Sequence, residues 1–290
     1  MKKILLSLLT VGAVGALAFG ASQAFFSDTE TSTGNTFTAG KLDLGIDNES
    51  FYNGLPNSGT SWAVSYDLSN GNGPANGAYL FYNFNDVKPG DFGEDTISVV
   101  VNDNDAWACT STTVTSDDDF TCTEPELDVD PGCTNPGLDT GELAGEIEIM
   151  WWADDGDNVL EVSENVIDGP GDLGSAPLDL GVIRKLADSQ GSIFSPTPAP
   201  LTGGTKYYIA KAWCFGDLGQ APLAQLVYTG PDDPVNDLVN TGGPATPEDG
   251  GFTCNGGVVT SNASQSDQVK LDVSFWAEQW RNNPTFTCAD

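Results

Sequence analysis

Short apolar runs of period two are the feature that most limits the folds open to this chain. In the clearest run, 269–275, four apolar residues alternate with three polar ones, and shorter runs cover 42–47, 97–101 and 146–151. Such alternation places apolar side chains on the core face of a strand and polar side chains on the solvent face. The 34 Gly and 17 Pro fall between these runs. This punctuation predicts an all-β chain with many turns.

Helical signals are weak by comparison. No stretch of 11 or more residues carries an apolar stripe of helical period, and the best helical candidate is the short segment from Leu178 to Ala187. Segments 188–204 and 229–251 are rich in Pro, Gly and Asp. We predict that both are long surface loops.

The N-terminus has the pattern of a secretory signal peptide. Lys2 and Lys3 precede an apolar run that ends near Phe19, and small residues lead to a predicted cleavage between Ala24 and Phe25. The alternative, an uncleaved membrane anchor, is disfavoured because a spanning helix needs ~20 apolar residues. We therefore expect a secreted protein, extracellular or at the cell surface. Cleavage removes two lysines and no acids, which leaves 266 residues with a formal charge of −34.

The charge balance excludes several function classes. The whole chain has 10 Lys and Arg, 42 Asp and Glu, and no His, so its formal net charge is −32. Binding to nucleic acid or anionic lipid requires clustered basic residues, so we expect neither partner, apart from the membrane that the signal peptide meets before cleavage. Without His there is no Ser-His-Asp triad and no HExxH zinc helix. We expect no enzyme activity, no catalytic residues and no required cofactor.

Six cysteines predict three disulfides, since an even number in an exported chain is typical of a disulfide framework. A structural zinc site is disfavoured because the chain has no CxxC and no His. Fifteen pairings are formally possible. We favour Cys214–Cys254, which closes the second long loop, Cys122–Cys133 as a local clip and, by elimination, Cys109–Cys288.

An acidic turn follows the run at 146–151. Carboxylate and amide side chains gather around Gly156, and hard oxygen ligands on a tight turn suit Ca²⁺, although the spacing is not that of an EF-hand loop. The alternative is a solvated hairpin turn whose Asp and Asn side chains bond to their own backbone. The candidate calcium ligands are Asp154, Asp155, Asp157, Asn158, Glu161 and Glu164.

Other notable side chains favour ordinary structural roles. We interpret the acidic runs Asp117–Asp119 and Asp232–Asp233 as solvated charge. With 42 acids in the chain, a pair of carboxylates carries no specific signal of glycosidase chemistry. The seven tryptophans follow strand positions, so core packing is expected, and an exposed strip that binds glycans is the alternative.

Three segments resemble proteins of the TasA/camelysin type, which are exported through a SipW-type signal peptidase. They are 22–44, with SQAFFSDTETS and NTFTAGKLDL, then 87–91, VKPGD, and 271–280, LDVSFWAEQW. The resemblance implies a jelly-roll-like two-sheet β-sandwich at the cell surface, in a family whose members build biofilm matrix fibres or pili. The middle of the chain, 103–265, departs from the cysteine-free biofilm members because it carries its own cysteines and loops.

The resemblance also implies a role for the mature N-terminus as a donor strand that pairs with the next subunit. Residues 25–40 are rich in Thr and Ser and begin with aromatics, so they suit pairing with an open sheet edge. The donor-strand candidates are Phe25, Phe26 and Phe37. The alternative is an ordinary edge strand of the same domain, or disorder. We expect a signal peptide at 1–24, this segment at 25–40, and a single β-sandwich domain with long insertions at 41–290.

The leading hypothesis is a non-enzymatic structural subunit that polymerises with itself, and it is also expected to meet other matrix or cell-surface components. The alternative is a calcium-dependent cell-surface binding module for glycan or matrix. Camelysin-type proteins have been classed as metallopeptidases, but a chain without His lacks the usual zinc ligands, so this activity is not expected here.

Overall fold

The computed structural model describes residues 42–172, 180–224 and 246–288. The chain divides into two units, Met1–Ala39 and Gly40–Asp290, and all described residues lie in the second. In this part, no helix has the length and apolar character needed to cross a membrane. The predicted cleavage site and donor-strand residues lie outside the described residues: Ala24, Phe25, Phe26 and Phe37.

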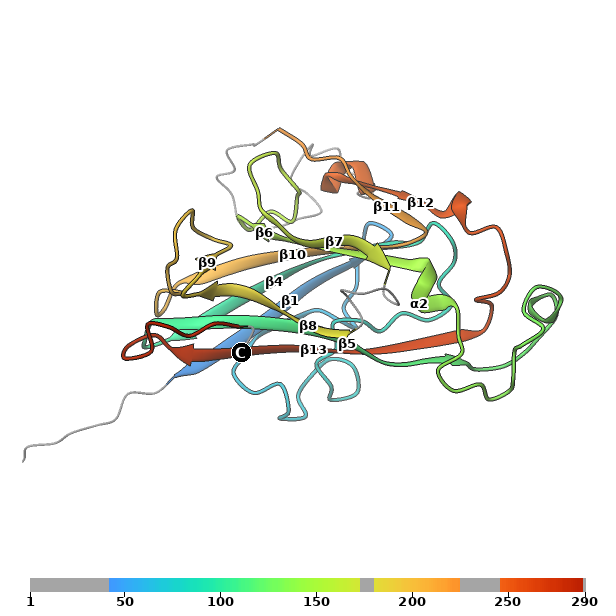
Figure 1. The fold of residues 1–290 in the computed structure, drawn as a ribbon, viewed down its shortest axis with the longest axis horizontal. Coiled ribbons are helices and arrows are strands. Elements are labelled where there is room, and N and C mark those ends of the chain that lie inside the picture. The colour runs from blue at the N-terminus through green and yellow to red at the C-terminus, as the bar shows by residue number, and fades with distance from the viewer. Residues whose placement is uncertain (1–41, 173–179, 225–245, 289–290) are drawn as a thin grey trace, which may run out of the picture. The chain divides into compact units, whose positions relative to one another are not determined.

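The larger sheet has seven antiparallel strands in the order β2-β1-β4-β10-β6-β7, with β3 paired to β1 (Figure 1). Its strands are β1 (Asp43–Tyr52), β2 (Leu55–Pro56), β3 (Trp62–Ser65), β4 (Phe92–Asn102), β6 (Ile147–Asp154), β7 (Val166–Asp172) and β10 (Lys206–Phe215).

The second sheet has four antiparallel strands in the order β13-β5-β8-β9, and β11 and β12 form a separate pair. These strands are β5 (Ala106–Asp119), β8 (Leu180–Asp188), β9 (Gly191–Ser192), β11 (Asp217–Gln220), β12 (Phe252–Asn255) and β13 (Asp267–Gln279). The short helical turns are η1 (Glu126–Asp128), α2 (Leu143–Glu146), η2 (Pro247–Gly250) and η3 (Gly256–Val258).

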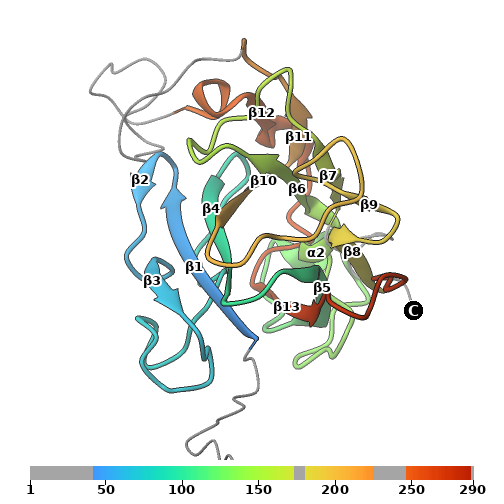
Figure 2. The ribbon, with the colours of Figure 1, turned by 90° about the vertical axis from the view of Figure 1, so that its left-hand side faces the viewer.

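The two main sheets form a jelly-roll-like β-sandwich, as predicted (Figures 1 and 2). The chain passes from one sheet to the other between β4 and β5, between β5 and β6, between β7 and β8, and between β9 and β10. Side chains from both sheets share one core, in which Ile97 and Ile209 meet Trp107 and Leu186. Burial of each such side chain contributes roughly 1.5–3 kcal/mol. Hydrophobic burial between the sheets therefore stabilises the fold.

The period-two runs were reliable predictors of strands, because they lie in β1, β4, β6 and β13. The helical prediction for 178–187 was wrong over its described part, since β8 pairs with β5 there, from Thr113 opposite Leu180 to Ala108 opposite Ala187. Pairing with a neighbouring strand and burial of Leu186 outweigh the weak local preference for helix.

Three disulfides join Cys109 to Cys288, Cys122 to Cys133 and Cys214 to Cys254. These are the pairs favoured above, the first of them by elimination. The first connects β5 to the C-terminal segment inside the core, and the last connects β10 to β12. No cysteine is free.

Candidate functional site

The strand β13 forms one edge of the second sheet. It pairs with β5 from Asp267 opposite Asp119 to Gln279 opposite Ala106, and among the described strands none pairs with its other edge. Its alternation is regular: the apolar residues are half-buried and the polar residues between them are exposed. Because a strand edge carries unpaired N–H and C=O groups, it can accept a further strand.

An apolar groove of about 1060 Å³ lies beside β13. Leu271 and Val273 form part of one wall, the segment 79–89 forms another, and core residues such as Ile149 and Trp213 also line it. Two of the three segments that resemble the TasA/camelysin family therefore contribute to this groove, through 87–89 and 271–273. The groove and the strand edge together have the chemistry that an added β-strand needs: apolar space for side chains and free hydrogen-bonding groups for the backbone.

Aromatic contacts hold the wall segment 79–89 in place. Phe84 packs on Trp213 with ring centroids 4.8 Å apart, and Phe81 packs on Phe275 of β13 at 5.8 Å and on Trp62 of β3 at 5.0 Å. Segment 79–89 is thus connected through its rings to both sheets.

A buried ion pair also contacts segment 79–89. Lys211 of β10 and Asp95 of β4 lie opposite each other, their side chains are fully buried, and Nζ is 2.8 Å from Oδ2. Lys211 also donates to the Phe81 carbonyl at 3.2 Å, and its Nζ lies 3.7 Å from the ring centroid of Tyr82. Burial lowers the pKa of Lys211, and the Asp95 carboxylate acts in the opposite direction. The ammonium therefore joins β10, β4 and segment 79–89, and β10 and segment 79–89 line the groove.

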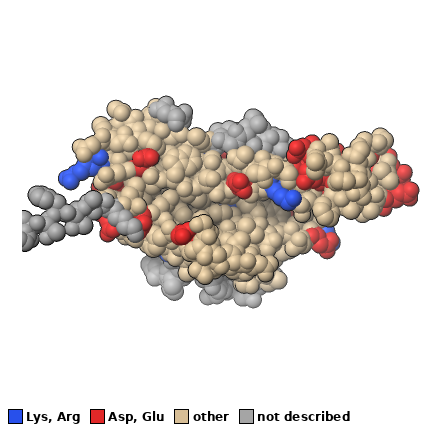
Figure 3. All heavy atoms as spheres, turned by 90° about the horizontal axis from the view of Figure 1, so that it is seen from below, with Lys and Arg blue, Asp and Glu red and all other residues tan. Residues whose placement is uncertain are grey.

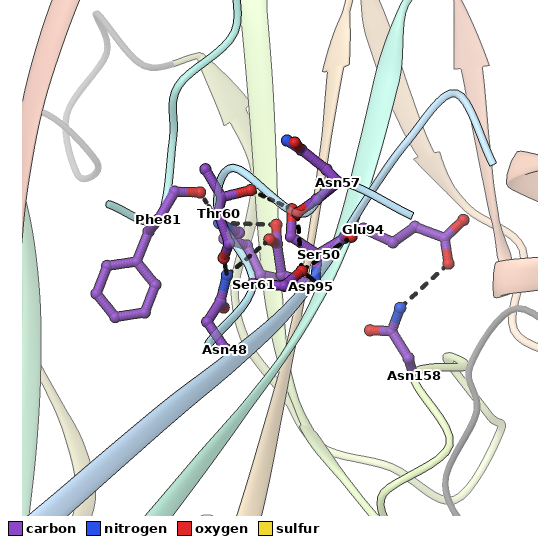
Figure 4. A network of polar contacts seen from close by, with 10 residues as sticks. Asn48, Ser50, Asn57, Thr60, Ser61, Phe81, Glu94, Asp95 and Asn158 are labelled. Atoms are coloured by element: carbon purple, nitrogen blue, oxygen red, sulfur yellow. Dashed lines mark hydrogen bonds and ion pairs between the residues drawn. The ribbon is translucent and has the colours of Figure 1, made fainter. Parts of the chain in front are cut away.

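A hydrogen-bond network extends from this pair toward β1 (Figure 4). Asn48 donates to Asp95 Oδ1 at 3.1 Å and to the Thr60 carbonyl at 2.7 Å, and Thr60 donates to Ser50 at 2.8 Å. Figure 4 shows Glu94 directed away from this network and toward Asn158, whose amide donates to Glu94 Oε2 at 3.2 Å. Burial, together with the charge of Asp95, raises the pKa of Glu94 to about 8.

The six candidate calcium ligands in and after the acidic turn fall into two groups: three side chains that hold the turn by hydrogen bonds, and three carboxylates that lie close to one another. Asp154 accepts hydrogen bonds from the backbone N–H groups of Gly156 and Asn158, at 2.9 and 3.1 Å, and Asp157 accepts one from Val159 at 3.0 Å. With Asn158 bound to Glu94, three of the six side chains hold the turn itself, as expected for a turn that bonds to its own backbone.

The other three, Asp155, Glu161 and Glu164, bring carboxylate oxygens within 4.8 Å of one another. Glu164 accepts from the backbone N–H of Asp155 at 3.2 Å and of Glu161 at 3.0 Å, which fixes both of its oxygens in the turn. Burial, followed by the charge of Asp154, raises the pKa of Glu164 to about 9. Burial and the neighbouring carboxylates also raise the pKa of Asp157 to about 8.

The interpretation of Asp117–Asp119 as solvated charge was wrong for Asp119. This residue ends β5 and is fully buried, and its carboxylate lies within 4.8 Å of those of Glu126 and Asp267. Sequence spacing gives no signal for this group, because Asp267 lies at the other end of the domain and meets Asp119 only through strand pairing.

The tryptophans follow the expected core role. All seven lie in described residues, and only Trp280 is exposed, at 42%. The alternative of an exposed aromatic strip therefore has little support from these side chains.

The residues do not fit a catalytic zinc centre. The chain has no His, and all six Cys are in disulfides, so neither imidazole nor thiolate is available as a ligand. What remains is carboxylate, carbonyl and hydroxyl oxygen, the ligand set of a hard cation.

Comparison with known proteins finds one family model, described as camelysin metallo-endopeptidase, that matches residues 1–55. No curated protein matches the chain. The matched stretch includes the first of the three segments named above and ends just after β1. Over residues 1–55, this match supports the resemblance of the chain to the TasA/camelysin family.

Proposed function

We propose that this protein is a secreted, non-enzymatic structural subunit that forms extracellular fibres at the cell surface by donor-strand exchange. The open edge of β13 beside the apolar groove carries this proposal. Segment 25–39 of a second copy has 15 residues, enough to pair along the 13 residues of β13. Backbone hydrogen bonds would provide affinity, and apolar side chains on one face of the donor strand, such as Phe25 and Phe37, would enter the groove, while Phe26 would lie on the opposite face.

Two further observations support this assignment. The family model matches the part of the chain that contains the proposed donor segment. The groove walls include the two other segments that resemble the family, which is the arrangement expected if donor and acceptor act together.

The first test compares fibre formation by protein that begins at Phe25 and protein that begins at Gly40, by electron microscopy. We expect fibres only from the longer protein. A synthetic peptide of residues 25–39 should bind the shorter one, which isothermal titration calorimetry measures. Fibres from the shorter protein, or monomers of the longer one at every salt and calcium concentration, would contradict donor-strand exchange.

A matched pair of variants tests the acceptor groove. Val273→Asp places a carboxylate on the groove side of β13, whereas Ser274→Asp places the same charge on the exposed side. We expect Val273→Asp to remove both fibres and peptide binding, and Ser274→Asp to retain them. Circular dichroism of each variant establishes that the sandwich is folded. Equal behaviour of the two variants would locate the acceptor elsewhere.

The second candidate function is a calcium-dependent surface-binding module, favoured by the carboxylate group of Asp155, Glu161 and Glu164. Calorimetric titration with Ca²⁺ tests it, and Glu164→Gln should weaken binding because it removes a carboxylate from the group. Asp128→Asn, a change at an exposed acid elsewhere, is the control. Absence of heat above background would remove this function.

A further inference from the structure

We propose a second Ca²⁺ site, formed where the end of β5 meets the start of β13. Its ligands are the carboxylates of Asp119, Glu126, Asp130, Glu142 and Asp267, here called the β5–β13 acid cluster. This site is separate from the acidic turn after β6 and does not depend on fibre assembly.

The cluster collects carboxylates from separate parts of the chain. The oxygens of Asp119, Glu126 and Asp267 lie within 4.8 Å of one another, and so do those of Asp119, Asp130 and Glu142. Asp119 ends β5 and Asp267 begins β13, and the two are direct partners in the sheet. Asp119 belongs to both groups, so the two groups adjoin at its carboxylate.

The Asp119 carboxylate indicates a bound ligand, because the side chain is fully buried and one of its two oxygens has no hydrogen-bond partner among the described residues. Its Oδ2 accepts hydrogen bonds from the Thr140 hydroxyl at 3.0 Å and from the Thr134 backbone at 3.4 Å. Its Oδ1 has no hydrogen-bond partner among the described residues. A buried carboxylate oxygen without a partner is costly, so natural proteins rarely leave one without a water or an ion.

Glu126 shows the same pattern. It is fully buried, and Oε2 accepts from the Ser266 hydroxyl at 3.1 Å and from the Thr123 backbone at 3.2 Å. Oε1 lies 3.3 Å from Cys133 Sγ, but this sulfur is in a disulfide and has no hydrogen to donate. The contact therefore leaves Oε1 unsatisfied.

Two more buried oxygens in the cluster lack partners among the described residues, Asp267 Oδ1 and Glu142 Oε2. The other oxygen of Asp267 accepts from the backbone N–H groups of Glu142 and Leu143, at 2.7 and 3.2 Å. These bonds hold the start of α2 against β13 and keep the Asp267 carboxylate in place.

Among the described residues, no ion pair compensates this charge. In the described part of the chain, the ion pairs of Lys88, Arg184, Lys206 and Lys211 all involve other acids. Burial, and then the charges of neighbouring carboxylates, raise the pKa of Glu142 to about 7. Burial raises the pKa of Asp267 to about 6, and nearby Asp119 and Glu126 add to the shift. A divalent cation would reverse this repulsion.

Ca²⁺ is the cation that the ligands favour. All five candidate side chains offer oxygen, and Ca²⁺ accepts six to eight oxygen ligands in variable geometry, whereas Mg²⁺ demands a near-ideal octahedron and keeps several waters. Carboxylates from separate segments fit the more permissive ion.

The site would have a structural consequence. Segment 120–142 projects from one end of the sandwich, where Figure 3 shows acidic side chains gathered, and its exposed acids include Glu124, Asp128 and Asp139 (Figures 1 and 3). Inside the segment, the Cys122–Cys133 disulfide closes a short loop around Glu126. An ion bound by Glu126, Asp130 and Glu142 would fasten this segment to Asp119 and Asp267 of the sandwich.

Equilibrium dialysis and thermal unfolding of the disulfide-intact protein test the proposal, with Ca²⁺, Mg²⁺ or EDTA. Asp119→Asn and Glu142→Gln should each lose one bound Ca²⁺, or bind it at least about ten-fold more weakly, and should lose most of the calcium-dependent rise in Tm. Asp128→Asn removes one negative charge from an exposed position in the same segment, and it should keep both the bound Ca²⁺ and the calcium-dependent rise in Tm. Glu164→Gln, in the other acidic turn, should also keep this site.

Glu142 is only half-buried, so Glu142→Gln tests the site even if Asp119→Asn fails to fold. Ca²⁺ binding by Glu142→Gln that equals that of Asp128→Asn would overturn the proposal. So would a Tm that responds to pH but not to Ca²⁺, because the carboxylates would then be satisfied by shared protons. If the protein that begins at Phe25 binds Ca²⁺ at the β5–β13 acid cluster but forms no fibres, the result counts against the proposed function alone.

Discussion

Lys211 is a charged residue in the interior of the sandwich. Its ammonium is fully buried, meets Asp95 at 2.8 Å and donates to the Phe81 carbonyl at 3.2 Å. Removal of one partner of a buried pair leaves an uncompensated charge, which costs more than the pair itself contributes. The pair therefore acts as a positioning device for segment 79–89 as well as a source of stability.

Lys211→Met should lower the free energy of unfolding by about 3–5 kcal/mol, because it leaves the Asp95 carboxylate buried without a cation. Lys206→Met is the control, since Lys206 pairs with Asp47 at 3.4 Å on the surface, where such pairs contribute about 1 kcal/mol or less. Urea unfolding followed by tryptophan fluorescence measures both. Similar losses in the two variants would mean that burial of the Lys211 pair is unimportant.

At the scale of elements, the acidic turn after β6 and the turn before α2 both contain carboxylates with raised pKa values. Burial raises the pKa of Asp154 and Glu142 to about 7 and that of Asp157 to about 8, from ordinary values of 3.8 and 4.5. The folded state therefore holds protons that the unfolded state has already released. These turns should respond to pH and to divalent cations together.

With EDTA present, the free energy of unfolding should fall as pH rises from about 5 to about 8. In this window the folded state binds more protons than the unfolded state, so a rise in pH destabilises the folded state. Ca²⁺ should reduce this slope, since the ion replaces the protons that stabilise the folded state. Urea unfolding across the pH series with and without Ca²⁺ measures the effect. A flat profile in EDTA would show that these carboxyls titrate normally.

The whole molecule combines a strong negative charge with a surface proposed to bind copies of itself. The formal net charge of −34 on the cleaved protein means that neighbouring subunits repel each other. At about 0.15 M ionic strength the screening length is about 8 Å, so contacts between exposed acids are weakened but not abolished. Divalent cations at the acid-rich end of the sandwich would reduce the repulsion further.

Fibre formation by protein that begins at Phe25 should therefore increase with ionic strength and with Ca²⁺, and should be slowest at low salt with EDTA. Time-resolved light scattering and electron microscopy measure this dependence. The variant Asp119→Asn separates the two contributions, because it should respond to NaCl as the parent does but less to Ca²⁺. Equal rates at low and high salt would show that the charge serves solubility alone.

The strands were accessible from the sequence because their signals are local. The Cys109–Cys288 pair, 179 residues apart, was reached only by elimination after the other two pairs. Alternation along β13 reflects which face each side chain takes, and this needs no knowledge of the partner strand. On β4 the expected solvent-facing side was wrong, because Ser98 is buried, as Ile97 and Val99 are. The same local reasoning found the acidic turn after β6, where the residues that hold the turn and the carboxylates beside them are close along the chain.

Only the tertiary structure decided the rest, since it depends on residues distant in sequence. Strand pairing made β8 a strand and brought Asp119 to Asp267, so an acidic run that looked solvated became a buried cluster. The packing of segment 79–89 created the groove beside β13. The sequence by itself determined where the alternating strands lie, because that signal is local, but the approach of distant strands determined where buried charge and open edges lie.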